Sequence, residues 1–218
     1  AANAAALADL QEKLAAEGVS MNTILVPMAA QVLTDKLPAH APVADYAAIL
    51  QVLTDAGVDT TDVFFTLAAH SSENIYYRTD HHWTQLGAYY AYTAFCEAAG
   101  FEAVPLEQFQ TGRYDIFLGS MYGFTEGYPQ SEVLKQNPDY LEYYLPIADT
   151  HARYYADGNL ESGTPVSVVY TELDDSVSNK YLCFIGGDTP ICIVESDVPG
   201  PTCIVLKESY GNAFVPFL

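Results

Sequence analysis

The stretch NTILVPMAAQVLTDKLPAHAPVADYAAILQVLTDAGVDTTDVFFTL, residues 22–67, decides the fold class. Its first part, NTILVPMA, has the pattern of a short buried strand, and the proline-broken loop KLPAHAPV follows it. Asp45 is placed to cap a helix that ends at Gly57, and VDTTDVFFTL then has the pattern of a second strand and its turn. Strand, helix and strand in this order predict a βαβ unit, and hence an α/β domain with a mainly parallel sheet and helices on both faces.

Two further helices are expected on either side of this unit. Residues 4–17 form an opening helix that ends at Gly18. Residues 85–98 form a second helix, with Thr84 as its N-cap and Gly100 as the glycine that follows its last turn.

The remainder of the chain changes character at about residue 165. Residues 101–165 are rich in Tyr, Gly and Pro with weak periodicity, which predicts long loops and short helices of the kind that often line a binding site. From there on, four apolar runs predict strands: VSVVYTE, YLCFIGG, ICIVE and TCIVLK.

Length and ends favour one domain over residues 1–218, truncated at one or both ends. The chain has 218 residues, half of them apolar, which is enough for one sizeable core. The start, AANAAALADL, has neither an initiator Met nor a signal-peptide pattern, and the end, NAFVPFL, stops inside an apolar pattern. No run of about 18 uncharged apolar residues predicts a membrane span.

The charge balance is strongly acidic, with 28 acidic and 8 basic residues and a net charge of −20. Such a surface repels phosphate backbones and anionic lipids, so we expect neither nucleic-acid nor membrane-surface binding. The simplest use of this charge is solubility. Seventeen tyrosines favour a polar, sugar-like ligand, although packing accounts for any single tyrosine at least as well.

The four cysteines, Cys96, Cys183, Cys192 and Cys203, all lie in apolar runs. None has a CxxC or Cys/His spacing, so no structural zinc site is expected. The last three are placed on neighbouring predicted strands, where either a disulfide or buried free thiols would fit.

The cluster RTDHHW, residues 78–83, contains the first candidate for chemistry. In an extended segment, Asp80 and His82 point to the same face, so the carboxylate can fix the tautomer of an imidazole base. His81 then faces away, and Trp83 forms a wall of the site. Arg78 shares the face of Asp80 and either holds it ionised, binds an acidic substrate group or makes a structural salt bridge. A structural Asp80–His82 pair at a helix start is the alternative.

A metal site made of Asp80, His81 and His82 is the third interpretation of the cluster. Adjacent histidines on a strand face opposite ways, and no fourth ligand is suitably spaced, so we expect neither a metal nor another cofactor.

A nucleophile for this base is predicted near the C-terminus. TCIVLK runs into ESYGNAFVPFL, which reads as strand, tight turn and helix, with Ser209 in the turn. The amides that follow Ser209 open the helix and can face an oxyanion, while Gly211 and Asn212 leave room for substrate. An ordinary serine N-cap is the alternative.

Taken together, YYRTDHHWTQLGAYYAY, FIGGD and LKESYGNAFVPFL resemble the bacterial DHHW protein family over residues 22–218. That family is similar to the SGNH-hydrolase-like domains of exopolysaccharide O-acetyltransferases, including the alginate acetylation proteins. The resemblance implies a three-layer SGNH-like domain in which an early Asp-x-His pair, here Asp80 and His82, serves a late serine, here Ser209.

The chain departs from the SGNH pattern around the serine. Lys207 and Glu208 precede Ser209 where Gly-Asp is usual, and no motif marks the oxyanion hole. Gly186 and Gly187 are candidate amide donors, whereas an ionised Asp188 would repel an oxyanion.

Three other side chains are candidates for binding substrate or an oxyanion. Asn212 is a candidate side-chain donor, and Trp83 and Tyr210 are further candidates for substrate contacts.

These observations predict a serine esterase or O-acetyltransferase that acts by a ping-pong mechanism on acyl groups of a cell-envelope or secreted polysaccharide. The acyl donor is not specified by any motif. The resemblance implies an extracytoplasmic location, with contact to a membrane only through a missing N-terminal signal or anchor. A non-catalytic glycan-binding or envelope-assembly protein that retains the fold is the alternative.

Overall fold

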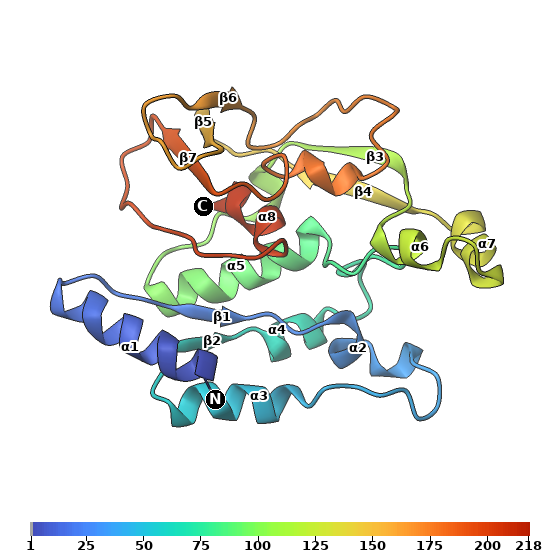
Figure 1. The fold of residues 1–218 in the computed structure, drawn as a ribbon, viewed down its shortest axis with the longest axis horizontal. Coiled ribbons are helices and arrows are strands. Elements are labelled where there is room, and N and C mark those ends of the chain that lie inside the picture. The colour runs from blue at the N-terminus through green and yellow to red at the C-terminus, as the bar shows by residue number, and fades with distance from the viewer. Residues whose placement is uncertain (1) are drawn as a thin grey trace. The chain divides into compact units, whose positions relative to one another are not determined.

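The computed structural model describes residues 2–218 as a mixed α/β fold with small sheets (Figure 1). The chain divides into two compact units. The first comprises the residues up to Glu73 together with Tyr90–Ala103, and the second comprises Asn74–Tyr89 and Val104–Leu218. The organisation as one domain over residues 1–218 stays a prediction.

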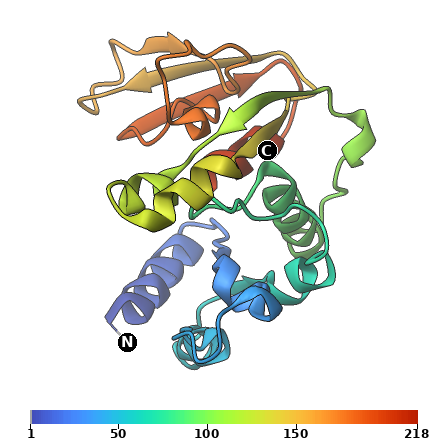
Figure 2. The ribbon, with the colours of Figure 1, turned by 90° about the vertical axis from the view of Figure 1, so that its right-hand side faces the viewer.

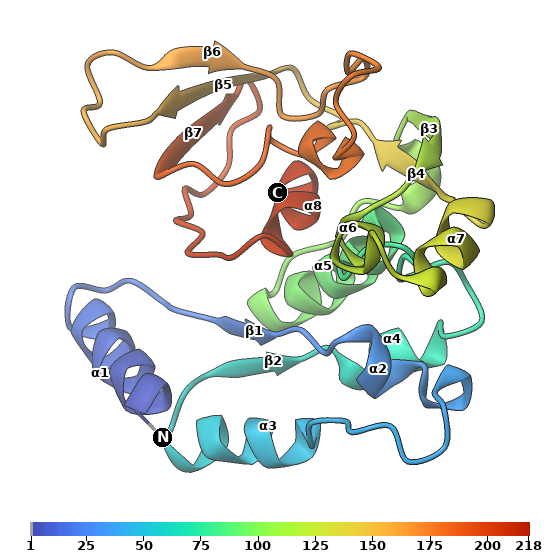
Figure 3. The same cartoon turned by 45° about the vertical axis from the view of Figure 1, so that its right-hand side comes forward.

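The first unit contains the predicted βαβ arrangement. Its elements are α1 Ala2–Ala16, β1 Thr23–Leu25, α2 Ala29–Val32, a 3-10 turn at Thr34–Lys36, α3 Tyr46–Asp55, β2 Thr60–Asp62 and α4 Phe64–Ala69. β1 and β2 pair in parallel with Thr23 opposite Thr60, and Figure 3 shows them side by side. Asp45 caps α3 by accepting a 3.1 Å hydrogen bond from the Ala48 amide, so this part of the prediction is confirmed.

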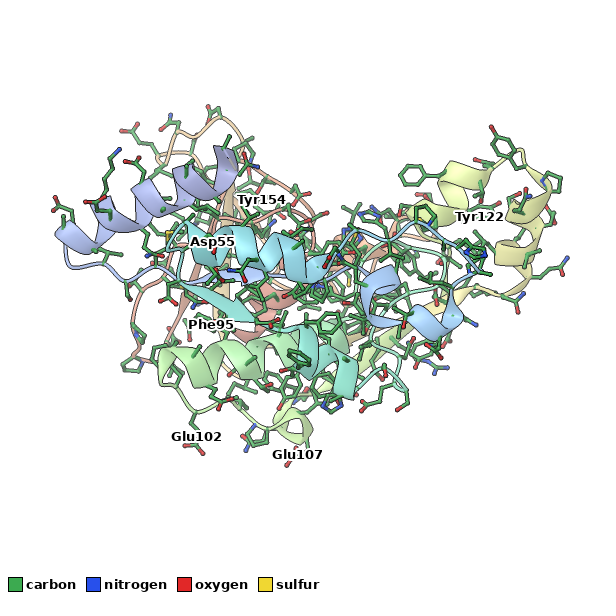
Figure 4. All side chains as sticks on the ribbon, turned by 90° about the horizontal axis from the view of Figure 1, so that it is seen from below. Asp55, Phe95, Glu102, Glu107, Tyr122 and Tyr154 are labelled. Atoms are coloured by element: carbon green, nitrogen blue, oxygen red, sulfur yellow. The ribbon has the colours of Figure 1, made fainter. Side chains whose placement is uncertain are left out.

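The core of this unit lies between α1, α3 and the segment after α3. Ala4, Leu53 and Val58 are buried there, with Leu25 of β1 packed against them. Gly57 ends α3 in the left-handed conformation at φ 76°, which a glycine adopts without steric cost. Asp55, labelled in Figure 4, is the last residue of α3.

Helix α5, Gln85–Ala99, begins in the second unit and ends in the first. Thr84 is its N-cap, since its hydroxyl accepts a 3.2 Å hydrogen bond from the Gly87 amide. Gly100 follows the helix at φ 76°. The predicted cap and terminator are thus confirmed, and the helix ends one residue later than predicted.

The second unit consists of two antiparallel sheets and short helices. Its elements are a 3-10 turn at Leu106–Gln108, β3 Thr111–Phe117, α6 Ser120–Thr125, α7 Pro129–Gln136, β4 Asp139–Tyr144, β5 Thr150–Tyr155, β6 Thr164–Val166, a 3-10 turn at Lys180–Cys183, β7 Ile191–Ser196, α8 Gly211–Phe214 and a 3-10 turn at Val215–Phe217. β3 pairs with β4, and β5 lies between β6 and β7 (Figures 2 and 3).

The expected mainly parallel sheet is therefore wrong for the described residues. Only the β1–β2 pairing is parallel, whereas β3–β4, β5–β6 and β5–β7 are antiparallel. The loops predicted for residues 101–165 contain three of these strands. Their sequences, TGRYDIF, DYLEYY and THARYY, alternate Tyr or apolar residues with charged ones, a half-buried strand pattern that the Gly and Pro content obscured.

The strands predicted after residue 165 are only partly present. ICIVE corresponds to β7, but YLCFIGG forms a 3-10 turn, and VSVVYTE contributes only the end of β6 and one bridge from Val169 to Phe184. TCIVLK pairs with no strand among the described residues, and Ile204 and Leu206 are 87% and 80% exposed. An apolar run predicts burial only where a neighbouring strand is available to cover it.

The core of the second unit is aromatic. Trp83, Phe117 and Phe184 are fully buried, and Tyr77 contacts Phe117 edge to face at 5.1 Å. Phe109 and Phe217 make a similar contact at 5.2 Å. Such pairs add about 0.5–1.5 kcal/mol to the area they bury.

All four cysteines are free thiols in this structure. Cys96 and Cys183 are buried, Cys192 is half-buried and Cys203 is exposed. Within residues 2–218, the structure contains no helix long and apolar enough to span a bilayer.

Candidate active site

The structure brings Asp80, His82 and Ser209 into one hydrogen-bonded chain. His82 Nδ1 lies 2.6 Å from Asp80 Oδ1, and His82 Nε2 lies 2.7 Å from Ser209 Oγ. The predicted hydrogen-bond contact between Ser209 and His82 is therefore present. Asp80 and His82 are buried, while Ser209 is partly accessible.

A closed loop, residues 75–84, holds Asp80 and His82. Tyr76 and Trp83 form an antiparallel bridge across it, and the Thr84 amide donates to the Ile75 carbonyl at 2.9 Å. A Cβ at Gly87 would lie 2.5 Å from the Ile75 carbonyl oxygen, so α5 packs this closely against the loop only because residue 87 is glycine.

The Asp80 carboxylate is saturated with donors. Oδ1 accepts from the His82 ring and from the His82 amide at 2.9 Å, and Oδ2 accepts from the Ser120 amide at 2.8 Å. Burial disfavours the charged form, but these hydrogen bonds outweigh it and lower the pKa of Asp80 to about 2. Asp80 is thus an anion at neutral pH and orients the imidazole.

The turn from β3 into α6 supplies the second support of Asp80. Gly119 lies so close that a Cβ there would overlap with Asp80 Cβ and Oδ2. The amides of Met121 and Tyr122 donate to the Thr79 carbonyl at 2.9 and 3.1 Å. This turn therefore fixes the position of Asp80 from outside its own loop.

A buried carboxylate, Asp139, holds the other side of the loop. Its Oδ2 accepts 2.7 Å hydrogen bonds from both the amide and the hydroxyl of Thr79, and its carboxylate also accepts from the Arg78 amide. The Arg78 side chain donates to Asp139 Oδ1 at 3.2 Å and to the Pro138 carbonyl at 2.7 Å. Of the three roles considered for Arg78, the structure shows the salt bridge, and its partner is Asp139 rather than Asp80.

The His82 ring lies between two other rings. Tyr181 stacks on it at 4.0 Å with an interplanar angle of 8°, and the His81 ring lies 3.8 Å away at 37°. Burial raises the pKa of Tyr181 well above its usual value, so its phenol stays protonated. The stacking restricts rotation of the imidazole that has to face Ser209.

The expectation that His81 faces away is wrong. Residues 78–82 form bends rather than a strand, so side chains do not alternate there. His81 Nδ1 lies 2.5 Å from Ser120 Oγ. Burial and the neighbouring His82 lower the pKa of His81, which favours its neutral form.

The same geometry places ligand atoms of Asp80, His81 and His82 within 4.8 Å of one another. The reason given for excluding a metal, that adjacent histidines diverge, therefore does not hold. However, both ring nitrogens of His82 are already hydrogen-bonded, one to Asp80 and one to Ser209, and His81 Nδ1 is hydrogen-bonded to Ser120. A metal would have to displace these bonds, and the absence of a metal stays a prediction.

The turn at Ser209 is anchored through the residue that follows it. Trp83 Nε1 donates to the Tyr210 carbonyl at 2.9 Å, and the Tyr210 hydroxyl donates to the His81 carbonyl. Trp83 is 1% exposed, so it packs beneath the turn instead of forming an open wall for substrate. The predicted strand before this turn is absent. The predicted turn and the helix after it are present: the Gly211 amide donates to the Glu208 carbonyl at 3.0 Å, and α8 begins at Gly211.

The role of Gly186, Gly187 and Asn212 as oxyanion donors stays a prediction. Asn212 is 2% exposed with Oδ1 unpartnered in the interior, and the Gly187 amide donates to the Phe184 carbonyl. Gly186 and Gly187 have φ angles of 72° and 99° and shape the turn after the 3-10 segment at Lys180–Cys183. Asp188 forms a 2.8 Å ion pair with Lys207.

The amide beside the serine has a partner of its own. The Tyr210 amide donates to Glu208 Oε2 at 3.1 Å, and the same oxygen lies 3.5 Å from Ser209 Oγ. An amide directly after a nucleophilic serine is a usual oxyanion donor. In this structure the Glu208 carboxylate occupies it.

A groove of about 860 Å³ opens beside the Asp80–His82 pair. His81, Ser120, Tyr114 and Tyr122 are among its lining residues. Tyr122, labelled in Figure 4, belongs to α6. Eight lining residues come from the β3–α6 segment, residues 111–125, which lies within the residues 101–165 expected to line a site. Residues 177–179 also line the groove but lie outside that range.

Sequence reasoning missed the roles of five residues that build the site: Gly119, Ser120, Asp139, Tyr181 and Glu208. All five lie far from residues 78–83 in the chain, and only Glu208 is next to another site residue, Ser209. The segment LGS, residues 118–120, offered the one local signal, because a glycine before a helix start often marks close backbone approach.

Comparison with known proteins identifies the family. The family model described as DHHW protein matches residues 20–218. The chain belongs to the DHHW family. A DHHW family protein from Eubacterium siraeum DSM 15702 is 32% identical, with a TM-score of 0.78 over 98% of this chain and 71% of that one. The search of curated proteins found no match.

More distant structures share the fold of this DHHW protein. Bacillus cereus PatB1, solved with a sulfonyl adduct, is 20% identical with a TM-score of 0.72 over 97% of this chain and 72% of that one. The O-acetyltransferase domain of Pseudomonas putida AlgJ is 22% identical with a TM-score of 0.52 over 77% and 57%. At these identities the likeness shows the fold alone.

Proposed function

We propose that this DHHW protein is a serine-dependent acyl-transfer enzyme, an SGNH-like esterase or O-acetyltransferase acting on acyl groups of a cell-envelope or secreted polysaccharide. One observation carries the proposal. Asp80, His82 and Ser209 are joined by hydrogen bonds of 2.6 and 2.7 Å in the order acid, base and nucleophile.

The first half-reaction acylates Ser209. His82 Nε2 takes the hydroxyl proton as Ser209 Oγ attacks the acyl carbonyl, and the imidazolium donates through Nδ1 to the Asp80 carboxylate. The tetrahedral intermediate collapses when its alcohol leaves with the proton from Nε2. The low pKa of Asp80 keeps it an anion throughout and so stabilises the imidazolium.

The second half-reaction releases the acyl group. An acceptor hydroxyl, from water in an esterase or from a sugar in a transferase, gives its proton to His82 Nε2 and attacks the acyl carbonyl. Ser209 Oγ leaves and recovers the proton. A sugar acceptor is supported by the groove beside His82, with the rings of Tyr114 and Tyr122 along it, and by the fold shared with an O-acetyltransferase domain.

Covalent labelling tests the proposal directly. A sulfonyl fluoride is a suitable reagent, since a structure of the similar PatB1 carries a sulfonyl adduct. We expect one label per chain, on Ser209, and loss of labelling in Ser209→Ala and His82→Ala. Ser162→Ala, an exposed serine with no side-chain hydrogen bond in the described residues, is the matched control. Labelling that persists in Ser209→Ala would refute the serine mechanism.

A second candidate function is supported by the Glu208 contact. Because the amide beside Ser209 donates to Glu208, the protein as it stands would suit a non-catalytic glycan-binding or assembly role. Absence of both labelling and acetyl-ester turnover, together with binding of an oligosaccharide, would favour this role.

The proposal also places the protein outside the cytoplasmic membrane, where polysaccharides of the envelope are found. Fractionation of the native host tests this location. Recovery of the protein in the cytosolic fraction alone would contradict it.

A further inference from the structure

The groove beside His82 is acidic. Asp115, Glu126 and Asp175 line it, and Lys180 is the one basic side chain among its lining residues, all of which belong to the described part of the chain. Asp80 also lines the groove, but its charge is engaged by His82 and Ser120. The remaining charges therefore decide which substrates the groove favours.

The positive charges near the groove are already used by the protein. Lys180 Nζ donates to the Asp174 carbonyl at 3.1 Å and lies 5.7 Å from the centre of the Tyr114 ring. Arg113 is paired with Asp115 at 2.6 Å and lies over the Tyr140 ring. Asp115 offsets the charge of Arg113, whereas Lys180 keeps its positive charge, because a backbone carbonyl and an aromatic ring do not neutralise it.

Two of the negative charges in the groove are not neutralised by an ion pair. Glu126 and Asp175 are exposed, and neither takes part in any ion pair formed by residues 2–218. Their field adds to that of a chain with a net charge of −20. A polymer with one carboxylate per sugar would bring further negative charges into this groove.

The uncharged part of the lining suits hydroxyl-rich rings. Tyr114 and Tyr122 add aromatic rings, the kind of surface on which sugar rings stack, and Leu118 and Val177 add apolar surface. The hydroxyl of Ser178 and the amide of Asn179 are available for neutral hydroxyl groups, although Asn179 Oδ1 already accepts from the Tyr181 amide.

We propose that the acceptor or acylated substrate of this groove is a non-anionic glycan, made of neutral sugars or amino sugars, and that polyuronates are disfavoured. This inference rests on the proposed function, because it concerns the substrate of the same site. Exposed charges a few ångströms apart repel weakly in water, but several act together on a polymer, and salt screens them. We expect a preference of about tenfold at low ionic strength.

The experiment first separates the serine chemistry from the glycan question. Labelling of Ser209 by a sulfonyl fluoride requires no glycan, so its failure would count against the proposed function itself. Unlabelled enzyme from a preparation shown to react with the sulfonyl fluoride is then used to measure acetyl transfer from 4-methylumbelliferyl acetate. The two acceptors have equal length: a β-1,4-glucose pentamer and a β-1,4-linked uronic acid pentamer.

At 20 mM NaCl, we expect the neutral pentamer to be used with about tenfold higher kcat/KM than the uronate, and the ratio to shrink at 0.5 M NaCl as screening increases. The double variant Glu126→Gln/Asp175→Asn should lower the ratio of the kcat/KM for the neutral pentamer to that for the uronate, because the kcat/KM for the uronate rises. The control Asp157→Asn/Glu161→Gln, which removes two exposed charges outside the groove, should leave the ratio unchanged.

Three results would overturn the inference. The first is use of the uronate as efficiently as the neutral pentamer at low salt. The second is an equal change of the ratio in the groove variant and in the control. The third is intact labelling with neither pentamer accepted nor bound, which would show that the groove is not a glycan site while leaving the serine mechanism standing.

Discussion

Gly119→Ala should disable the candidate site from outside the loop that contains Asp80. The backbone of Gly119 has φ −90°, which any residue adopts, so alanine causes no backbone strain. The obstacle is space, because the added Cβ would overlap with Asp80 Cβ and Oδ2. Either the carboxylate or the β3–α6 turn must move.

The size of the effect follows from these contacts. Overpacking of a buried position costs about 1–3 kcal/mol, which lowers Tm by about 2–12 °C in a protein of this length. Displacement of Asp80 also weakens its hydrogen bond to His82 Nδ1. A hydrogen bond to a charged group is worth about 1.5–3 kcal/mol, so labelling of Ser209 by a sulfonyl fluoride should slow by about ten- to a hundredfold.

Gly123→Ala is the matched control in the same segment. Gly123 lies in α6, and a Cβ there would meet no atom within 4 Å. Alanine is favoured over glycine in a helix by about 1 kcal/mol, so Tm should stay the same or rise, and labelling should be unchanged. A Gly119→Ala protein with native Tm and native labelling rate would refute the role assigned to the β3–α6 turn.

Three other changes test the electrostatics and the anchoring of the site. The pKa of Asp80 is about 2 in the folded state and near 3.9 in the unfolded state, so the folded state binds fewer protons between these values. Ionised Asp80 therefore contributes about 2 kcal/mol to the free energy of unfolding above pH 4, and this contribution is lost as the pH falls toward 2. Denaturant titrations between pH 2 and 5 should therefore show a shallower loss of stability in Asp80→Asn, and parallel curves would contradict this account. Glu208→Ala frees the Tyr210 amide and removes a negative charge near Ser209, so labelling of Ser209 should accelerate several-fold. Slower labelling would instead show that Glu208 supports the turn. Trp83→Phe leaves the Tyr210 carbonyl without its indole donor, which should cost about 1 kcal/mol in chemical unfolding and slow labelling; no change in either would show that the 2.9 Å contact is dispensable.

The sequence predicted the contacts among Asp80, His82 and Ser209 better than it predicted their surroundings. Asp80 and His82 are two residues apart, so a hydrogen bond between them depends on a few local dihedral angles. Ser209 was placed by a turn signal in its own segment. The Asp80–His82 pair and the turn at Ser209 are both present, although the strand expected before Ser209 is absent and residues 78–82 are bends.

What sequence reasoning missed is non-local. Asp139 lies 60 residues from Thr79, and Ser120 lies 40 residues from Asp80, yet both make hydrogen bonds of 2.8 Å or less to that loop. Nothing in either local sequence indicates its partner. The antiparallel strands of residues 111–155 were hidden for a related reason, because their half-buried alternation was weak beside abundant Gly, Pro and Tyr.

The orientation of His81 shows why a correct pair does not imply a correct neighbourhood. Strand alternation would separate the two imidazoles, but the bend lets Asp80 Oδ1 accept from the amide and from the ring of His82 at once. That arrangement turns the backbone at residue 81 and brings its ring to 3.8 Å from His82. Ser120 then holds His81 through its hydroxyl while holding Asp80 through its amide. The contact that places the acid therefore also places the second imidazole, and a substitution at Ser120 that spares its amide would affect His81 without releasing Asp80.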